Sequence, residues 1–251
     1  KTAYEIVDCD WSSDVCSSDL QLAEESGLIV KIGEWVLREA CKFNRMLLER
    51  GFPALRIAIN LSARQLTHYD IVRAVAQVLR DTELPPECLE LELTESMVMN
   101  EPEKVIGTLG QLRALGIQLS IDDFGTGYSS LSYLKRFPVM SLKIDRSFVS
   151  ELDEDDDHDA SAIVRAIISI AHSLEIKVIA EGVETEHQMS FLLANGCDSM
   201  QGFLFSKPLT GSEFIALLER ESAGSGPSSL LRQLQLSFFD KPTAAVEITD
   251  S

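Results

Sequence analysis

Acidic and amide side chains close several runs of aliphatic residues in this 251-residue chain. In each run the aliphatic residues occupy alternate positions and the polar residue takes the other parity, as Glu92 does among Leu89, Leu91 and Leu93. The polar set consists of Asn60, Glu92, Asp122, Lys143, Asp145 and Glu181, with Glu95, Asp123 and Glu184 shortly after the same runs. So many carboxylates in one place would repel one another strongly unless something neutralised them.

Divalent cations are the natural neutralising partner for such a set. Oxygen ligands without Cys or His favour Mg²⁺, Mn²⁺ or Ca²⁺ over zinc. One or two of the acids could instead pair with Lys143 or cap a helix, but that does not account for all of them. We therefore expect a site for divalent cations where these strands end.

A loop with two glycines, residues 122–130, follows the third aliphatic run. Adjacent acids cannot share one face of a regular strand, but at its end Asp122 and Asp123 can serve two cations. Gly125 and Gly127 permit positive φ and close approach of the backbone to a ligand. The Asp-Phe-Gly triplet also occurs in protein kinases, but this chain has no kinase glycine loop and no His-Arg-Asp segment, so we discard that class.

The elements that must position these residues alternate between strand and helix patterns. We expect strands at 56–60, 89–93, 118–122, 141–145, 177–181 and 199–204, and helices at 28–48, 70–79, 102–115, 131–137, 159–174, 186–195 and 211–219. Six strand-then-helix units predict an α/β fold with a parallel sheet. We interpret it as a (β/α) barrel that lacks its opening strands. In a barrel the polar residues would meet at the C-terminal mouth. An open doubly wound sheet is the alternative, although no G-x-G-x-x-G follows any strand.

Composition excludes several classes of partner. The chain has 22 Lys and Arg against 40 Asp and Glu, which gives a net charge of −18. This balance argues against binding to DNA, RNA or an anionic membrane, and no apolar run approaches the roughly 20 residues of a membrane span. The five cysteines are scattered and form no C-x-x-C pair, so they indicate reduced thiols in a cytoplasmic protein.

Both ends differ from the regular middle. Residues 10–20 repeat Ser-Ser-Asp and resemble one reading frame of a sequencing adapter, so we interpret them as an assembly artefact within an unassigned leader, 1–20. The alternative is a genuine Ser/Asp-rich loop. Residues 221–251 are predicted to be a linker and tail of no assigned function. The acidic run 153–159 is expected to be a solvated loop, since the Gly and terminal Glu of an EF-hand are absent.

Taken in order, the motifs resemble those of the EAL domain family, bacterial phosphodiesterases of cyclic di-GMP. The matching stretches lie at 22–27, 60–66, 92–96, 122–130, 142–145, 180–184 and 201–205. The resemblance implies an EAL phosphodiesterase domain over residues 21–220, folded as a modified TIM barrel with one antiparallel strand.

The resemblance also implies roles for single residues. Asn60, Glu92 and Asp122 are similar to the ligands of one cation, and Asp122, Asp123 and Glu181 to those of a second. The implied catalytic residues are Lys143, Glu181 and Asp145, of which Lys143 resembles the lysine beside the attacking water and Asp145 the acid that supports it. Glu95 resembles the glutamate that anchors the loop containing Phe124, Gly125, Thr126 and Gly127, which couples the site to a dimer interface. Glu184 and Gln201 match further site positions.

The implied reaction is hydrolysis of cyclic di-GMP to linear pGpG with two Mg²⁺ or Mn²⁺ ions, and Ca²⁺ is expected to inhibit. The cations would also explain how an acidic chain binds an anionic dinucleotide. Whether Glu181 or a bridging hydroxide is the base stays open. Implied partners are a second copy of the chain and upstream sensory or GGDEF domains, in the cytoplasm or on the cytoplasmic side of a membrane-anchored parent. The alternatives are a silent cyclic di-GMP receptor, against which the intact acids argue, and an unrelated barrel hydrolase.

One part of the family pattern is missing. The Glu-Ala-Leu signature, with an arginine shortly after it, is expected at about residues 1–3, where the chain reads Lys1-Thr2-Ala3. That segment supplies a metal ligand, a phosphate contact and part of an opening strand. We therefore expect an active parent enzyme but little or no activity from this polypeptide.

Overall fold

The computed structural model describes residues 22–68, 70–127, 131–152 and 158–222. The predicted leader, residues 153–157 of the acidic run, the end of the 122–130 loop and the tail after residue 222 lie outside the described residues. Within the described part, no helix combines the length and the apolar character that a bilayer span requires.

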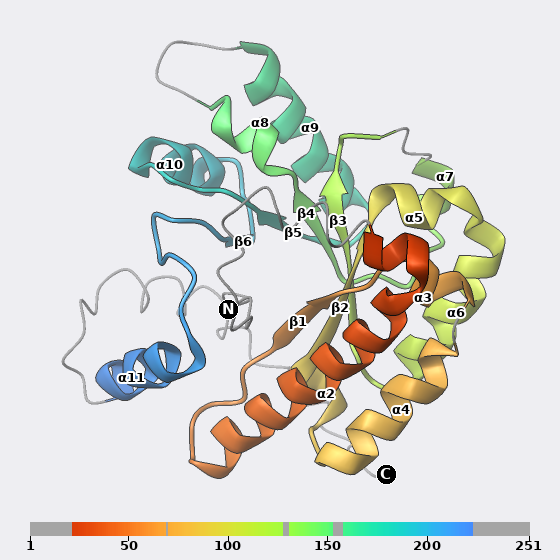
Figure 1. Cartoon of the computed structure of the whole chain (residues 1–251). Coiled ribbons are helices and arrows are strands. Elements are labelled where there is room, and N and C mark those ends of the chain that lie inside the picture. Colours follow the sequence, from red (N-terminus) through yellow and green to blue (C-terminus); the bar gives the residue numbers. More distant parts are fainter. Residues whose placement is uncertain (1–21, 69, 128–130, 153–157, 223–251) are drawn as a thin grey trace, which may run out of the picture.

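A single curled sheet of six parallel strands forms the centre of the molecule (Figure 1). In chain order the strands are β1 (Ile57–Asn60), β2 (Leu89–Thr94), β3 (Gln118–Phe124), β4 (Ser141–Ile144), β5 (Lys177–Ala180) and β6 (Ser199–Met200). Each strand lies beside its sequence neighbour, so β1 and β6 are the edges of the described sheet. This half-barrel confirms the predicted (β/α) class. The antiparallel strand implied by the resemblance is not among the described strands.

Helices connect the strands and cover the outer face of the sheet (Figure 1). The long ones are α2 (Leu28–Glu49), α4 (Ile71–Thr82), α6 (Pro102–Ala114), α9 (His158–Ser173), α10 (Glu186–Ala194) and α11 (Gly211–Ser222). The short ones are α3 (Ala63–His68), α5 (Glu95–Asn100), α7 (Leu131–Leu134), α8 (Arg146–Ser150) and the 3₁₀ turn η1 (Pro86–Cys88). We predicted all the long helices and α7. The other short elements span too few residues to show a period.

The last predicted strand is wrong in its extent. It was expected to reach residue 204, but β6 ends at Met200. The following segment turns back onto Val183, whose N–H donates to Gln201 O at 3.0 Å and whose carbonyl accepts from Leu204 N at 3.0 Å. A Cβ at Gly202 would lie 2.2 Å from Val183 O, so only glycine permits this approach.

The core lies between the sheet and the helices. Aliphatic side chains of one parity fill it, as predicted: Leu89, Leu91, Leu93, Leu119, Ile121, Leu142, Ile144, Val178 and Ala180 are all fully buried. Each such Leu or Ile contributes about 1.5–3 kcal/mol relative to leaving it exposed. Residues of the other parity face the interior of the half-barrel, which is where the polar set gathers.

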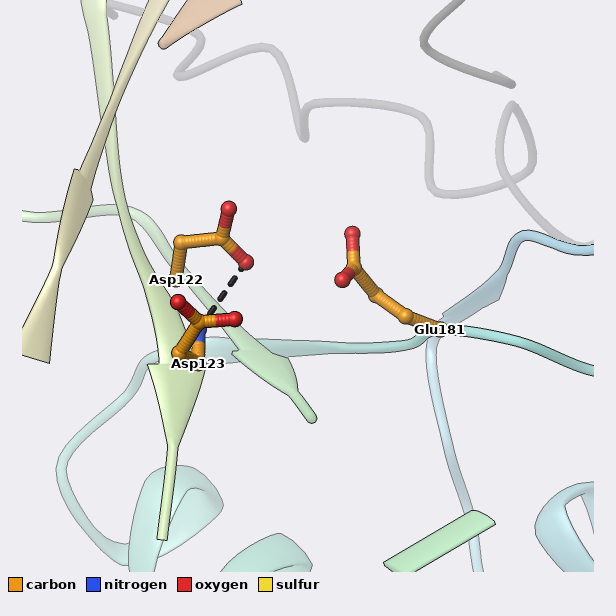
Figure 2. A group of neighbouring side chains, drawn as sticks. All are labelled: Asp122, Asp123 and Glu181. Atoms are coloured by element: carbon orange, nitrogen blue, oxygen red, sulfur yellow. Dashed lines mark hydrogen bonds between the residues drawn. The ribbon is translucent and has the colours of Figure 1, made fainter. Parts of the chain in front are cut away.

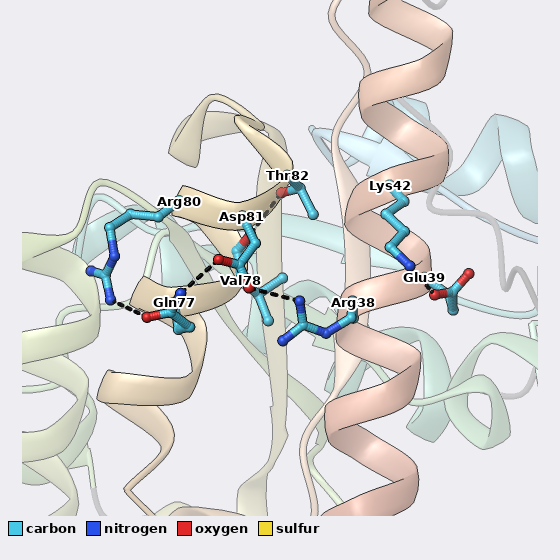
Figure 3. Close-up of polar contacts among 8 residues, drawn as sticks. All are labelled: Arg38, Glu39, Lys42, Gln77, Val78, Arg80, Asp81 and Thr82. Atoms are coloured by element: carbon cyan, nitrogen blue, oxygen red, sulfur yellow. Dashed lines mark hydrogen bonds and ion pairs between the residues drawn. The ribbon is translucent and has the colours of Figure 1, made fainter.

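Polar contacts between α2 and α4 add little to this core (Figure 3). Arg38 Nη1 donates to Asp81 Oδ2 at 2.8 Å, and Gln77 Nε2 donates to Asp81 Oδ1 at 2.6 Å. The hydrogen bond from Arg38 is the main cause that lowers the pKa of Asp81. Both charged side chains are about one-third exposed, so solvent screens the pair. The apolar stripe of each helix therefore determines how the two helices pack.

Gly33 of α2 supports a specific prediction about how β1 is held. A Cβ at residue 33 would lie 2.1 Å from Gln65 Nε2. The buried Gln65 cannot move freely, because its Oε1 accepts hydrogen bonds from Ser62 N at 3.1 Å and Ser62 Oγ at 3.0 Å, just after β1. We expect Gly33→Ala to lower the free energy of unfolding by about 1–3 kcal/mol, measured by urea denaturation.

The matched control is Gly107→Ala in α6, where an added Cβ meets no atom within 4 Å. There the change should be neutral or should stabilise the helix by up to about 1 kcal/mol. Equal stabilities for the two variants would contradict the packing of Gly33 against Gln65.

Candidate active site

Asp122 and Asp123 both reach the site because the end of β3 is irregular. The register with β4 shifts between Ile121 and Phe124. At this bulge Asp123 has a φ of 54°, a left-handed conformation that Asp tolerates better than most residues. Asp123 N donates to Asp122 Oδ1 at 2.9 Å. The bulge explains how adjacent acids face one region, which a regular strand forbids (Figure 2).

Glu181 completes a cluster of three carboxylates with Asp122 and Asp123 (Figure 2). One carboxylate oxygen from each residue lies within 4.8 Å of the other two. Glu181 directly follows β5, and its N–H donates to Ile144 O at 3.2 Å. Asp122 is buried and the other two are half-buried. This all-oxygen group, drawn from β3 and β5, suits Mg²⁺ or Mn²⁺, and it is the second of the two predicted ligand sets.

Lys143 of β4 lies between the carboxylates. Its Nζ lies 2.8 Å from Glu92 Oε2, 2.5 Å from Glu181 Oε1 and 3.5 Å from Asp122 Oδ1. The Lys143 side chain is 4% exposed. Burial alone would lower the pKa of Lys143, but the three carboxylates outweigh burial and raise it, so the ammonium stays charged. Pairing of some acids with Lys143, which the sequence left open, is therefore what the structure shows.

The same burial acts on the acids. It raises the pKa of Glu92 to about 7, although the charge of Lys143 opposes the change. Burial is also the main cause that raises the pKa of Glu181, and Lys143 again opposes it. One ammonium thus partly compensates several desolvated carboxylates.

Asp145 begins α8 as its N-cap. Its Oδ1 accepts from Ser147 N at 2.9 Å and from Ser147 Oγ at 2.5 Å. Burial acts to raise the pKa of Asp145, but these hydrogen bonds outweigh it and lower the pKa. Neighbouring Asp123 shifts the opposite way: burial raises its pKa first, and the charges of Asp122 and Asp145 add to the effect. Asp145 is therefore an anion that borders the cluster.

Glu95 holds the loop after β3. This buried side chain accepts a hydrogen bond at Oε2 from Gly125 N at 2.8 Å. A Cβ at Gly127 would lie 3.2 Å from Glu95 Oε1. Gly125 has a φ of 102°, and a Cβ there would lie 2.8 Å from the Phe148 ring. These contacts are consistent with the anchoring role that the resemblance implied for Glu95; that role and the coupling to a dimer interface stay predictions.

The remaining predicted residues lie around this centre. Asn60 is exposed at the end of β1 and is the strand partner of Glu92. Phe124 is buried in the core, and Thr126 Oγ1 donates to Asp123 O at 2.9 Å. In the described hydrogen bonds Glu184 and Gln201 take part through their backbones, as in Gln201 N to Ala180 O at 2.8 Å. The functions of their side chains stay predictions.

Sequence reasoning missed a polar layer beneath the cluster. Glu90 of β2 is buried, and its carboxylate accepts from Ser141 Oγ at 3.1 Å and from Arg56 Nη1 at 3.3 Å. Ser120 of β3 is also buried in this layer. Both acids of β2 have one parity, so the alternation in 89–93 contained the signal for Glu90. For the serines only the register between strands reveals their position.

Comparisons with known proteins identify the family whose sequence and fold this chain shares. The family model described as "EAL domain" matches residues 17–208. MucR of Pseudomonas aeruginosa, named a bifunctional diguanylate cyclase/cyclic di-GMP phosphodiesterase, is 50% identical over 197 residues. The match covers 78% of this chain but 28% of MucR, so the chain spans less than a third of that relative.

Two solved structures extend the comparison. The MucR phosphodiesterase in complex with c-di-GMP has a TM-score of 0.76 and 49% identity, covering 79% of each chain. BlrP1 of Klebsiella pneumoniae, in a complex with calcium and cyclic di-GMP, has a TM-score of 0.64 and 33% identity, covering 72% of this chain and 45% of its own.

The buried ammonium gives a prediction for the metal-free protein. Lys143→Met keeps most of the length of the side chain but removes the charge that faces three carboxylates. We expect the free energy of unfolding at pH 7.5 in the presence of a chelator to fall by about 3 kcal/mol, measured by urea denaturation. The loss of stability should shrink towards pH 5. Lys143 opposes the raised pKa of Glu92 and Glu181, so in the variant these carboxyls take up protons more readily, and protonation of a group whose folded-state pKa is raised stabilises the fold.

Lys177→Met is the matched control, since Lys177 is exposed on the adjacent strand β5. That change should alter stability by no more than about 0.5 kcal/mol. If the two variants unfold at the same urea concentration, Lys143 does not hold the acids together.

Proposed function

The chain belongs to the EAL domain family, and from this premise we propose that its parent protein hydrolyses cyclic di-GMP to linear pGpG using two Mg²⁺ or Mn²⁺ ions. The observation that carries the proposal is the convergence of Asp122, Asp123 and Glu181 around one point, with Lys143 beside them. The relatives named as cyclic di-GMP phosphodiesterases support the substrate, and the calcium in the BlrP1 complex supports a divalent cation site.

The positions of the side chains support the first proposed ligand set, and the family resemblance supplies the second. Asp122, Asp123 and Glu181 would hold one cation, and Asn60, Glu92 and Asp122 the other. When bound, such cations polarise a phosphodiester oxygen and lower the pKa of a coordinated water. They also give the mouth of an acidic chain the positive charge that an anionic dinucleotide requires.

The other residues would orient these groups. Lys143 keeps its proton and offers a buried cation beside the reacting phosphate, where a low dielectric strengthens its field. Asp145 keeps its negative charge next to Asp123. Glu95 fixes the backbone at Gly125 and so limits where the Asp123 carboxylate can lie. Glu181, in the cluster, would be placed to take a proton from the attacking water, whose pKa a bound cation would lower.

Binding without turnover is the second candidate function. The observation that favours it is the absence of the Glu-Ala-Leu signature at residues 1–3. Against it stand the intact acids of the cluster, which a receptor does not need.

We also propose that the domain acts as a cytoplasmic homodimer. We further propose that it belongs to a larger signalling protein, as the bifunctional name of MucR suggests for that relative.

The proposed reaction is tested by product analysis. We expect cyclic di-GMP incubated with the chain and Mn²⁺ to yield pGpG, identified by mass spectrometry. Glu181→Ala should reduce the rate by about 100-fold or more, because it removes a ligand from the cluster. Glu39→Gln on exposed α2 is the control and should keep the parental rate. Hydrolysis that is unaffected by Glu181→Ala would refute the assigned site.

The same assay with Ca²⁺ separates the two candidate functions. Calorimetry should detect cyclic di-GMP binding in Ca²⁺ while the turnover assay detects no pGpG. If cyclic di-GMP binds in the presence of every cation but is hydrolysed in none, also after residues 1–20 have been replaced, the receptor function is favoured.

The reading Lys1-Thr2-Ala3 predicts that this polypeptide turns over slowly. Replacing residues 1–20 with a segment that carries the Glu-Ala-Leu signature and the following arginine should raise the rate by about 100-fold, because the resemblance assigns a cation ligand and a phosphate contact to that segment. The measurement is the steady-state rate of the parent and the chimera at saturating Mg²⁺. Full turnover by the unmodified chain would contradict this prediction.

A further inference from the structure

Ser120 carries a hydroxyl that the fold does not use. The residue is 0% exposed, and its Oγ has no hydrogen-bond partner among the described residues. A buried polar group without a partner is costly, and proteins rarely keep one without a reason. The hydroxyl is also a flexible donor, since its hydrogen rotates towards any acceptor that comes within reach.

The sheet register places Ser120 beside a predicted cation ligand. Its strand partners are Glu92 on β2 and Ser141 on β4. Paired residues of parallel strands are about 4.8 Å apart and project from the same face. Glu92 faces the interior, where it meets Lys143, while Leu119 and Ile121 on either side of Ser120 fill the core beneath the helices. The Ser120 hydroxyl therefore shares the interior with the Glu92 carboxylate.

Its neighbour Ser141 shows what a purely structural serine does in this layer. Ser141 is also buried and lies in the same row of the sheet, but its Oγ donates to Glu90 Oε1 at 3.1 Å. Two serines on adjacent strands thus differ in one respect: one hydroxyl has an acceptor and the other has none.

The contact between Glu92 and Lys143 explains why the Ser120 hydroxyl has no acceptor among the described residues. Glu92 Oε2 is held by Lys143 Nζ at 2.8 Å, which draws the carboxylate towards β4. A cation bound by Glu92 would replace this ammonium as the neutralising charge, and the carboxylate would turn. Carboxylates that bind metals are themselves usually held by a hydrogen bond, and such outer partners strongly affect metal affinity.

We propose that Ser120 is a positioning residue: its hydroxyl donates to the Glu92 carboxylate when a divalent cation occupies the site. The inference rests on the proposed cation-dependent function and adds to it a residue that orients a ligand without touching the cation or the phosphodiester. It assigns the unused donor of β3 to the cation-loaded form of the protein.

The test compares Ser120→Ala with Ser141→Ala in the full chain. Mn²⁺ affinity is measured by calorimetry up to millimolar concentrations, and melting temperature is measured separately in the presence of a chelator. We expect Ser120→Ala to weaken Mn²⁺ binding by about 10-fold or more and to leave the metal-free melting temperature unchanged or higher. Ser141→Ala should show the reverse: a lower metal-free melting temperature and Mn²⁺ affinity within about 2-fold of the parent.

Ser120→Cys controls for volume, because it fills the same space with a weak donor. It should bind Mn²⁺ as weakly as Ser120→Ala does. The inference is overturned if Ser120→Ala binds Mn²⁺ as tightly as the parent, or if Ser120→Cys restores full affinity. If the parent chain itself binds no Mn²⁺, the proposed function is contradicted, and the inference with it. If the parent binds Mn²⁺ and Ser120→Ala binds it equally tightly, only the inference is contradicted.

Discussion

The ammonium of Lys143 is the charge that the buried carboxylates of this half-barrel approach, and it offsets part of their mutual repulsion. Three carboxylates from β2, β3 and β5 approach it, and all four side chains are largely removed from water. Such a group is stable only when the attraction among its members offsets the loss of hydration. The same acids suit a divalent cation, because carboxylate oxygens are the ligands that such ions prefer.

The irregular end of β3 adds the remaining element. A continuous strand would have directed Asp122 and Asp123 to opposite faces, leaving a single acid in the interior. The bulge and the left-handed conformation of Asp123 bring both carboxylates to one side. This conformation costs backbone energy, so the surrounding loop must hold it in place. Strain of this kind commonly marks functional positions. Here it coincides with the only cluster of three or more acids within 4.8 Å in the described chain.

The sequence was sufficient for those features that are encoded locally. Alternating aliphatic residues predicted β1 to β5, and their parity placed Glu92, Asp122 and Glu181 on the face opposite the aliphatic core. The bulge at Asp123 could not be predicted, because it depends on pairing with β4. Likewise the early end of β6 follows from contacts with Val183, and the positions of Ser120 and Ser141 follow from the register between distant segments. Local patterns contain no information about such pairings.

The loop after β3 is held in place on two sides. Glu95 of α5 holds the N–H of Gly125, while Phe148 of α8 and Ile167 of α9 leave no room for even a methyl group on its other side. Residue 125 is therefore tightly packed between these helices. A shift of α8 or α9 against α5 would therefore press on residue 125, two residues after Asp123. The packing of these helices thus bears on how the acids are aligned.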